Sequence, residues 1–136
     1  MKKSIILFIL LLLVFTAGCS ASAPAADTEK NSPIFHQISQ DEAKEMMAKD
    51  DGHVVVDVRR QDEYDAGHIP GAILVPNESI GCDSPEALPD YDQIILVYCR
   101  TGNRSKQAAQ KLAGMGYTNI YEFGGITTWT GDVVTD

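Results

Sequence analysis

The chain has 136 residues, of which 44% are hydrophobic and 22% charged, so its composition is that of a globular protein with room for one domain. Its 19 acidic and 11 basic side chains give a net charge of −8. A surface this acidic argues against nucleic acid as a partner and against spontaneous adsorption to anionic lipid, because both need clustered cations.

The first 18 residues are typical of a secretory signal peptide. Two lysines precede an apolar run over 5–15, and these 11 residues are too few to cross a bilayer as a helix, which takes about 20. Residues 16–19 (Thr-Ala-Gly-Cys) resemble a bacterial lipobox, although such signals more often begin with leucine. The resemblance implies cleavage before Cys19 and attachment of acyl chains such as palmitate to its sulfur. The alternative is an ordinary cleaved signal with an incidental cysteine.

A polar segment follows the signal. It is rich in Ala, Ser and Pro and has no apolar periodicity, so it cannot bury enough surface to fold. The predicted organisation is a signal peptide over 1–18, the lipidated Cys19 with a flexible tether over 19–33, and a folded domain over 34–136. Two or three acyl chains would hold that domain in the cell envelope, outside the cytoplasm, at a membrane that the sequence does not identify.

The first half of the domain alternates helix and strand signals. Ser39 and Glu42 form a capping-box pattern before apolar residues at helical spacing, which predicts a helix. The β-branched run over 54–56 predicts a strand buried on both faces. A polar helical turn closed by Gly67 follows, and then a short strand over 73–75.

The second half repeats this alternation. Residues 94–98 are the most apolar strand and should lie centrally, and 105–115 form an amphipathic helix. A last short strand over 120–121 precedes a break at Gly124-Gly125. Strands alternating with helices predict an α/β domain whose central sheet is mainly parallel and is flanked by helices on both faces.

The junction between the strand over 94–98 and the next helix carries the chemistry. The strand delivers Cys99 into a short polar loop, where loop N–H groups and the positive end of the helix dipole stabilise a thiolate. Arg100 and Arg104 add positive charge, and Gly102 permits a positive φ that lets the loop curl. The alternative is that Cys99 is a small buried apolar residue at a strand end.

Five motifs, in order, resemble those of single-domain rhodaneses and span the chain from residue 34. They are Asp57-Val58-Arg59, Glu63-Tyr64, Gly67-His68-Ile69-Pro70-Gly71-Ala72, Cys99-Arg100-Thr101-Gly102-Asn103-Arg104-Ser105, and Gly124-Gly125-Ile126 with Trp129. The resemblance implies a catalytic cysteine in a loop at the carboxyl ends of parallel strands, where open α/β sheets generally bind ligands.

Loop length separates sulfur chemistry from phosphorus chemistry within this resemblance. Rhodaneses use a six-residue loop that opens with the cysteine, whereas phosphatases of the same architecture use one residue more. Cys99 and Arg104 are five positions apart, so the loop is of the shorter kind and favours sulfur transfer over a phosphatase or arsenate reductase. The implied substrate-binding loop consists of Arg100, Thr101, Gly102, Asn103, Arg104 and Ser105.

Four further residues receive smaller roles. The resemblance implies that Asp57 and Arg59 join the loops around the site through charge-assisted hydrogen bonds. His68 is expected to stabilise a turn and not to act as a base, because a loop that already stabilises a thiolate needs no base. Cys82 either resolves an oxidised or persulfidated Cys99 or is a bystander. No Cys-x-x-Cys or paired histidine spacing supports a metal site, and no cofactor is expected.

Three functions stay open. The leading one is a membrane-tethered sulfurtransferase that takes sulfane sulfur from thiosulfate or a similar anion and passes it from a Cys99 persulfide to cyanide or a thiol. Mercaptopyruvate is less favoured because the loop is cationic. The second is a non-enzymatic module that binds sulfur or partner proteins, and the third is a redox sensor using Cys82. We expect a monomer.

Overall fold

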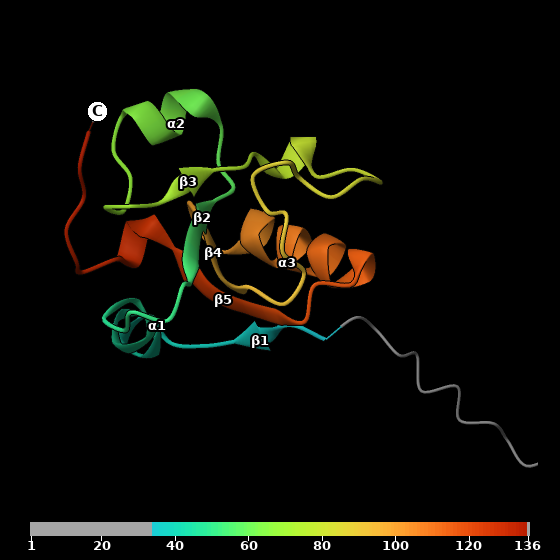
Figure 1. Ribbon diagram of the computed structural model, residues 1–136. Helices are drawn as coiled ribbons and strands as arrows, with labels where there is room; N and C mark the ends of the chain where they lie inside the picture. Colours follow the sequence, from blue (N-terminus) through green and yellow to red (C-terminus); the bar gives the residue numbers. More distant parts are fainter. Residues whose placement is uncertain (1–33, 136) are drawn as a thin grey trace, which may run out of the picture.

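The computed structural model describes residues 34–135 (Figure 1). The signal peptide over 1–18, the lipidation site at Cys19 and the tether to residue 33 all lie outside the described residues. Between 34 and 135, no helix combines the length and the apolar character needed to cross a membrane.

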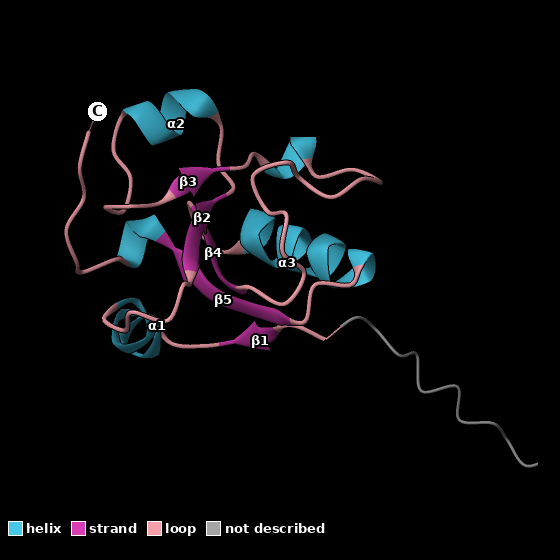
Figure 2. Cartoon of the chain, in the orientation of Figure 1, coloured by secondary structure: helices cyan, strands magenta, loops and turns pink. Residues whose placement is uncertain are grey.

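A five-stranded sheet forms the centre of the domain, with strand order β1-β5-β4-β2-β3 and every neighbouring pair parallel (Figure 2). The strands are β1 (His36–Gln37), β2 (Val54–Asp57), β3 (Ile73–Leu74), β4 (Ile94–Cys99) and β5 (Asn119–Gly125). The predicted strand over 94–98 is β4, and the prediction that it lies centrally is confirmed. The last five residues of β4 are buried. A parallel strand in this position is covered on both faces, which is why it reads as one continuous apolar run.

Helices cover both faces of the sheet, as predicted. They are α1 (Gln40–Met47), α2 (Gln61–Asp65) and α3 (Asn103–Met115), with single 3-10 turns η1 (Asn77–Ser79) and η2 (Ile126–Thr128). On one face, Ala108, Ala109 and Leu112 of α3 pack into the larger apolar cluster. On the other, Ala43 of α1 and Tyr64 of α2 contact a second cluster.

The capping box predicted before α1 is present. The Ser39 side chain accepts the backbone N–H of Glu42 at 3.2 Å, and the Glu42 carboxylate accepts the N–H of Ser39 at 2.7 Å. These two bonds satisfy N–H groups that would otherwise have no partner at the helix start. They fix where the segment after β1 turns into the helix.

The last strand differs from its prediction. A two-residue strand was expected to stop before the paired glycines, whereas β5 continues through Gly124 and Gly125. A bulge between Val97 and Cys99 shifts the register so that Gly125 pairs with Cys99. Continuation depends on glycine, because a Cβ at Gly125 would overlap the carbonyl of Arg100. The two-residue β1 was also not predicted, since both its residues are exposed and only pairing with β5 defines it.

Candidate active site

Cys99 lies at the carboxyl end of the central strand, with 1% of its surface exposed. The chain turns through Arg100, Thr101 and Gly102 and enters α3 at Asn103. Gly102 has φ 104°, the left-handed conformation predicted for it, and its N–H donates to Cys99 Sγ at 3.0 Å. The loop therefore curls around the sulfur.

The environment of Cys99 favours its thiolate. Burial raises the pKa of the Cys99 thiol, but hydrogen bonds from the Ser105 side chain and from nearby backbone N–H groups outweigh burial, so the pKa lies below its ordinary value. Those N–H groups belong to Ser105, Gly102 and Thr101. Ser105 is in the first turn of α3, whose N–H groups have no partner within the helix. This arrangement can hold an anionic sulfur, which an ordinary apolar position would not do.

The paired glycines of β5 support the loop from behind. A Cβ on Gly125 would stand 2.6 Å from Thr101 Cα, so only glycine lets the strand pass this close. The Arg100 carbonyl accepts the backbone N–H of Thr127 at 3.2 Å and its hydroxyl at 3.0 Å. The loop is thus anchored to β5 and η2 through its backbone, which leaves the Arg100 side chain exposed.

Arg104 is held by a partner from α2. Its two terminal nitrogens donate to the two carboxylate oxygens of Glu63 at 2.7 and 2.8 Å. The Glu63 carboxylate also accepts the N–H of Arg60 at the start of α2, at 3.3 Å. The hydrogen bonds from Arg104 lower the pKa of Glu63 to about 2. Glu63 thereby joins α2 to the active-site loop.

The two arginines of the loop are therefore not equivalent. The positively charged guanidinium of Arg104 lies near Cys99 but forms an ion pair with the Glu63 carboxylate. Among residues 34–135, the Arg100 side chain has no ion pair or hydrogen bond, so its guanidinium is available to an anion in solvent. No role for Glu63 was predicted from the sequence beyond its place in a motif, because its partner is 41 positions away.

The predicted supporting residues lie on the α2 side of the sheet. Asp57 and Arg59 form a buried ion pair, with the shortest nitrogen–oxygen distance 2.7 Å, and Arg59 also donates to the Gly67 carbonyl at 2.7 Å. His68 is buried and stacks on the Tyr64 ring with centroids 3.7 Å apart. These contacts fasten the segment after β2 to the turn after α2.

One buried acidic residue was not predicted. Glu122 of β5 is 3% exposed and lies behind the loop, where it accepts the Ser105 hydroxyl at 2.6 Å and the Gly124 N–H at 2.9 Å. In the sequence, Glu122 is a single carboxylate between two aromatic residues of a short strand. A carboxylate in such an apolar setting is typical of a buried acid that has hydrogen-bond partners or a functional role.

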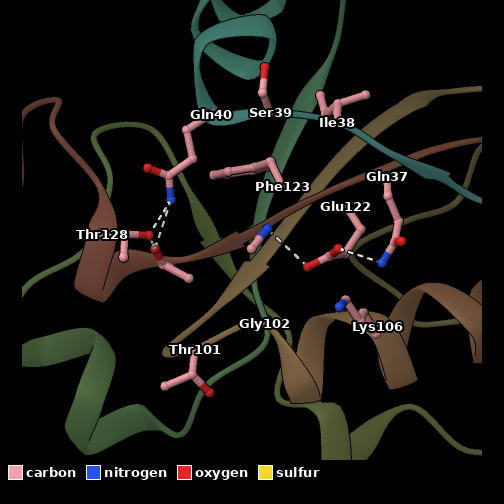
Figure 3. Close-up of a pocket in the computed structure, with 12 residues that line it drawn as sticks. Gln37, Ile38, Ser39, Gln40, Thr101, Gly102, Lys106, Glu122, Phe123 and Thr128 are labelled. Atoms are coloured by element: carbon pink, nitrogen blue, oxygen red, sulfur yellow. Dashed lines mark hydrogen bonds between the residues drawn. The ribbon is translucent and has the colours of Figure 1, made fainter.

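Glu122 also faces a pocket of about 410 Å³ behind the loop, shown in Figure 3. Residues from β1, the start of α1, the loop, α3, β5 and η2 line it: Gln37, Ile38, Ser39, Gln40, Thr101, Gly102, Lys106, Glu122, Phe123, Gly124, Gly125 and Thr128. Cys99 is not among the lining residues, whereas Thr101 and Gly102 of its loop are. The pocket therefore adjoins the loop that carries Cys99.

Cys82 lies in an exposed loop and, like Cys99, is a free thiol. Between residues 34 and 135, no three His, Cys, Asp or Glu side chains are grouped so that they could hold a metal ion.

The family model for the rhodanese-like domain matches residues 39–132. The chain belongs to the rhodanese-like domain family. Within it, thiosulfate sulfurtransferase GlpE of Pseudomonas entomophila is 41% identical over 96 residues, covering 70% of this chain and 84% of that protein. Thiosulfate sulfurtransferase PspE of Escherichia coli is 37% identical over 71 residues, covering 52% of this chain and 68% of PspE.

Solved structures agree with this rhodanese-like fold. A rhodanese with anions from E. coli superimposes with a TM-score of 0.57 and 32% identity, over 62% of this chain and 99% of that one. A rhodanese-like domain protein from Staphylococcus aureus gives a TM-score of 0.63 and 28% identity, over 75% and 99%. The predicted fold and family are confirmed.

Proposed function

We propose that this protein is a sulfurtransferase that moves sulfane sulfur from thiosulfate, or a similar anionic donor, through a Cys99 persulfide to a thiol or cyanide. The observation that carries the proposal is the Cys99 sulfur, which is buried at the carboxyl end of β4 and accepts the Gly102 N–H at 3.0 Å. Hydrogen-bond donors of the loop lower its pKa although burial raises it. Its relatives GlpE and PspE are named thiosulfate sulfurtransferases, which supports the same donor here.

In the first step, the Cys99 thiolate attacks the outer sulfur of thiosulfate. A new sulfur–sulfur bond forms, the bond between the two donor sulfurs breaks, and sulfite leaves with the electron pair. The outer sulfur of the persulfide is then the anionic atom, and the loop N–H groups are preorganised to stabilise it. No proton moves in this step.

In the second step, an acceptor attacks the outer sulfur and Cys99 leaves as a thiolate. Cyanide gives thiocyanate, and a deprotonated thiol gives a new persulfide. The donors that lower the pKa of Cys99 also make it a better leaving group. One arrangement of hydrogen bonds therefore serves both halves of the cycle.

Arg100 is the residue we assign to the sulfonate end of the donor. It is exposed beside Cys99, whereas both terminal nitrogens of Arg104 are bound to Glu63. Arg104 would then shape the loop and add positive charge, with Arg100 making the direct contact.

The test is transfer of one sulfur atom. The reduced protein and its Cys99→Ser variant are each given thiosulfate, examined by intact mass, and then given cyanide while thiocyanate is followed. A gain of one sulfur on the unsubstituted protein only, discharged by cyanide, is the expected result. No gain on fully reduced protein would refute thiosulfate transfer and favour the non-enzymatic module or the redox sensor.

Membrane attachment is a separate proposal that rests on the sequence of residues 1–33. We expect an alkyne analogue of palmitate to label the protein in a bacterial host and a Cys19→Ser variant to remain unlabelled. Equal labelling of both would refute acylation at Cys19.

A further inference from the structure

The pocket of Figure 3 lies where open α/β sheets generally bind ligands, at the carboxyl ends of the strands. Strand β5 stands between β1 and β4 in the sheet. The helix that follows β1, α1, packs on one face of the sheet, whereas the helix that follows β4, α3, packs on the other. The starts of both helices and the carboxyl ends of β1 and β5 line the pocket. It is therefore the crevice that opens where the two crossover connections diverge.

The acid that lines this pocket has one oxygen with spare hydrogen-bonding capacity. Glu122 is 3% exposed, and its Oε1 accepts the Ser105 hydroxyl at 2.6 Å and the Gly124 N–H at 2.9 Å. Among residues 34–135, Oε2 accepts a single hydrogen bond, from the Gln37 amide at 3.4 Å. That distance is longer than the roughly 2.7–3.2 Å of an ordinary N–H···O bond. Oε2 of this buried carboxylate can therefore accept a stronger donor from the pocket.

The base that lines the pocket is also unpaired. Lys106 is an exposed residue in the first turn of α3, and Figure 3 shows it on the same side of the pocket as Glu122 and Gln37. Within the described part of the chain, its ammonium has no ion pair or hydrogen bond, with Glu122 or with any other group. The other ten lining residues are uncharged. The pocket thus presents one negative and one positive charge that do not neutralise each other.

These two charges select the class of ligand. An inorganic anion would be attracted by Lys106 but repelled by the Glu122 carboxylate, and a simple amine would leave Lys106 without a partner. In the described residues no three His, Cys, Asp or Glu side chains are grouped so that they could hold a metal ion. A molecule that carries an ammonium and a carboxylate on the same carbon satisfies both side chains at once.

We propose that this pocket binds an α-amino acid group, either as a free amino acid or as one end of a longer molecule. The ammonium of the ligand donates to Glu122 Oε2, and its carboxylate pairs with Lys106. A volume of about 410 Å³ lies within the roughly 300–1,000 Å³ of small-molecule pockets, which admits either form. The bound ligand lies against Thr101 and Gly102, two residues of the loop that carries Cys99.

Backbone amide NMR of the reduced full chain in mild detergent tests this assignment. L-alanine is compared with ethylamine, which lacks the carboxylate, and with propionate, which lacks the ammonium. We expect L-alanine to shift the N–H signals of Gly102 and Gly124, which line the pocket, and not that of Gly52, which precedes β2. Each fragment should need at least about tenfold higher concentration for half-saturation, because it loses one charge-assisted contact. Binding of L-alanine no tighter than that of either fragment would overturn the proposal.

Two variants and a matched control test the two charges. Lys106→Met removes an exposed, unpaired charge, so it should leave the fold intact and weaken L-alanine binding at least about tenfold. Glu122→Gln should weaken binding by at least the same factor, since the acceptor of the ammonium becomes neutral. Lys49→Met removes an exposed lysine charge just after α1, outside the pocket, and binding should stay within about twofold. Unchanged binding in Lys106→Met would overturn the proposal, whether or not Glu122→Gln folds.

S-methylglutathione distinguishes the two sources of the amino acid group. It carries that group at one end of a longer molecule, and its blocked sulfur cannot take part in sulfur transfer or disulfide exchange. Tighter binding than that of L-alanine supports the proposal and assigns the pocket to the end of a longer molecule, whereas equal or weaker binding supports it with a free amino acid. No shift of Gly102 and Gly124 with either compound would overturn it. These titrations need no sulfur donor, so a failed sulfur-loading test would refute the proposed function alone.

Discussion

The ion pair between Glu63 and Arg104 gives the sharpest test of how the loop is held. Replacing Glu63 with Gln keeps an oxygen that can accept a hydrogen bond but removes the charge. The fall in the pKa of Glu63 from 4.5 to about 2 corresponds to about 3 kcal/mol of ionic stabilisation before solvent screening. Because the Arg104 and Glu63 side chains are 25% and 15% exposed, water screens the pair, and we expect a loss of about 1 kcal/mol at pH 7.

The pH dependence of this loss follows from the direction of the shift. The folded pKa of Glu63 is lowered, so its contribution is complete above its unfolded value of 4.5 and disappears as the pH falls toward 2. The free energy of unfolding, measured in urea, should therefore differ between the unsubstituted protein and Glu63→Gln at pH 7. At pH 3 this difference should fall to less than half of its value at pH 7. Asp62→Asn is the control, because its partner Arg60 is exposed and that pair should contribute little. A Glu63→Gln loss that is the same at both pH values, or absent at pH 7, would refute the reasoning.

Three shorter predictions follow from the same site. Arg100→Gln should raise KM for thiosulfate roughly tenfold without changing the urea midpoint, because the proposed mechanism assigns its exposed side chain to the donor. An unchanged KM would contradict the assignment of Arg100 to donor binding. Gly125→Ala should lower the rate of sulfur loading roughly a hundredfold, since its Cβ would lie 2.6 Å from Thr101 Cα and displace the loop. Asp57→Asn should cost about 3 kcal/mol or more of unfolding free energy, measured in urea, because it leaves the Arg59 charge buried without its partner.

Much of the fold could be predicted because its signals are local. The apolar run over 94–98, the glycine at 102 and the apolar face of the following helix each reflect a requirement of one short segment, and together they placed Cys99 at a strand end before a helix. The capping box at Ser39 is local in the same sense, since it involves residues three apart. Local patterns therefore located both the central strand and the candidate nucleophile.

The remaining features depend on pairing between distant segments. The Glu63–Arg104 pair joins residues 41 apart, and the bond from Ser105 to Glu122 joins residues 17 apart. Nothing in the neighbourhood of either acid specifies its partner. The extension of β5 to Gly125 likewise follows from its bulged pairing with Cys99, which periodicity within β5 cannot indicate. The contacts that fasten the loop to α2 and β5 thus come from tertiary structure, whereas the donors to the Cys99 sulfur lie within the loop and the first turn of α3.

Cys82 provides the last prediction, on whether the site has a built-in redox partner. Its loop is fixed at both ends by buried Ile80 and Leu88, and the cysteine itself is exposed, whereas Cys99 is 1% exposed and its sulfur accepts the Gly102 N–H. A disulfide needs Cβ atoms about 3.5–4.5 Å apart, and both cysteines are free in the structure.

We therefore expect Cys82→Ser to load and discharge sulfur within about twofold of the unsubstituted protein, since it removes no group that touches the sulfur. Peptide mass spectrometry after mild peroxide treatment should find Cys99 oxidised without a link to Cys82. A Cys82–Cys99 disulfide peptide, or a larger change in turnover, would contradict this and assign Cys82 a resolving role. Because Cys99 is buried and Cys82 exposed, such a link would need local opening of the structure around the Cys99 sulfur.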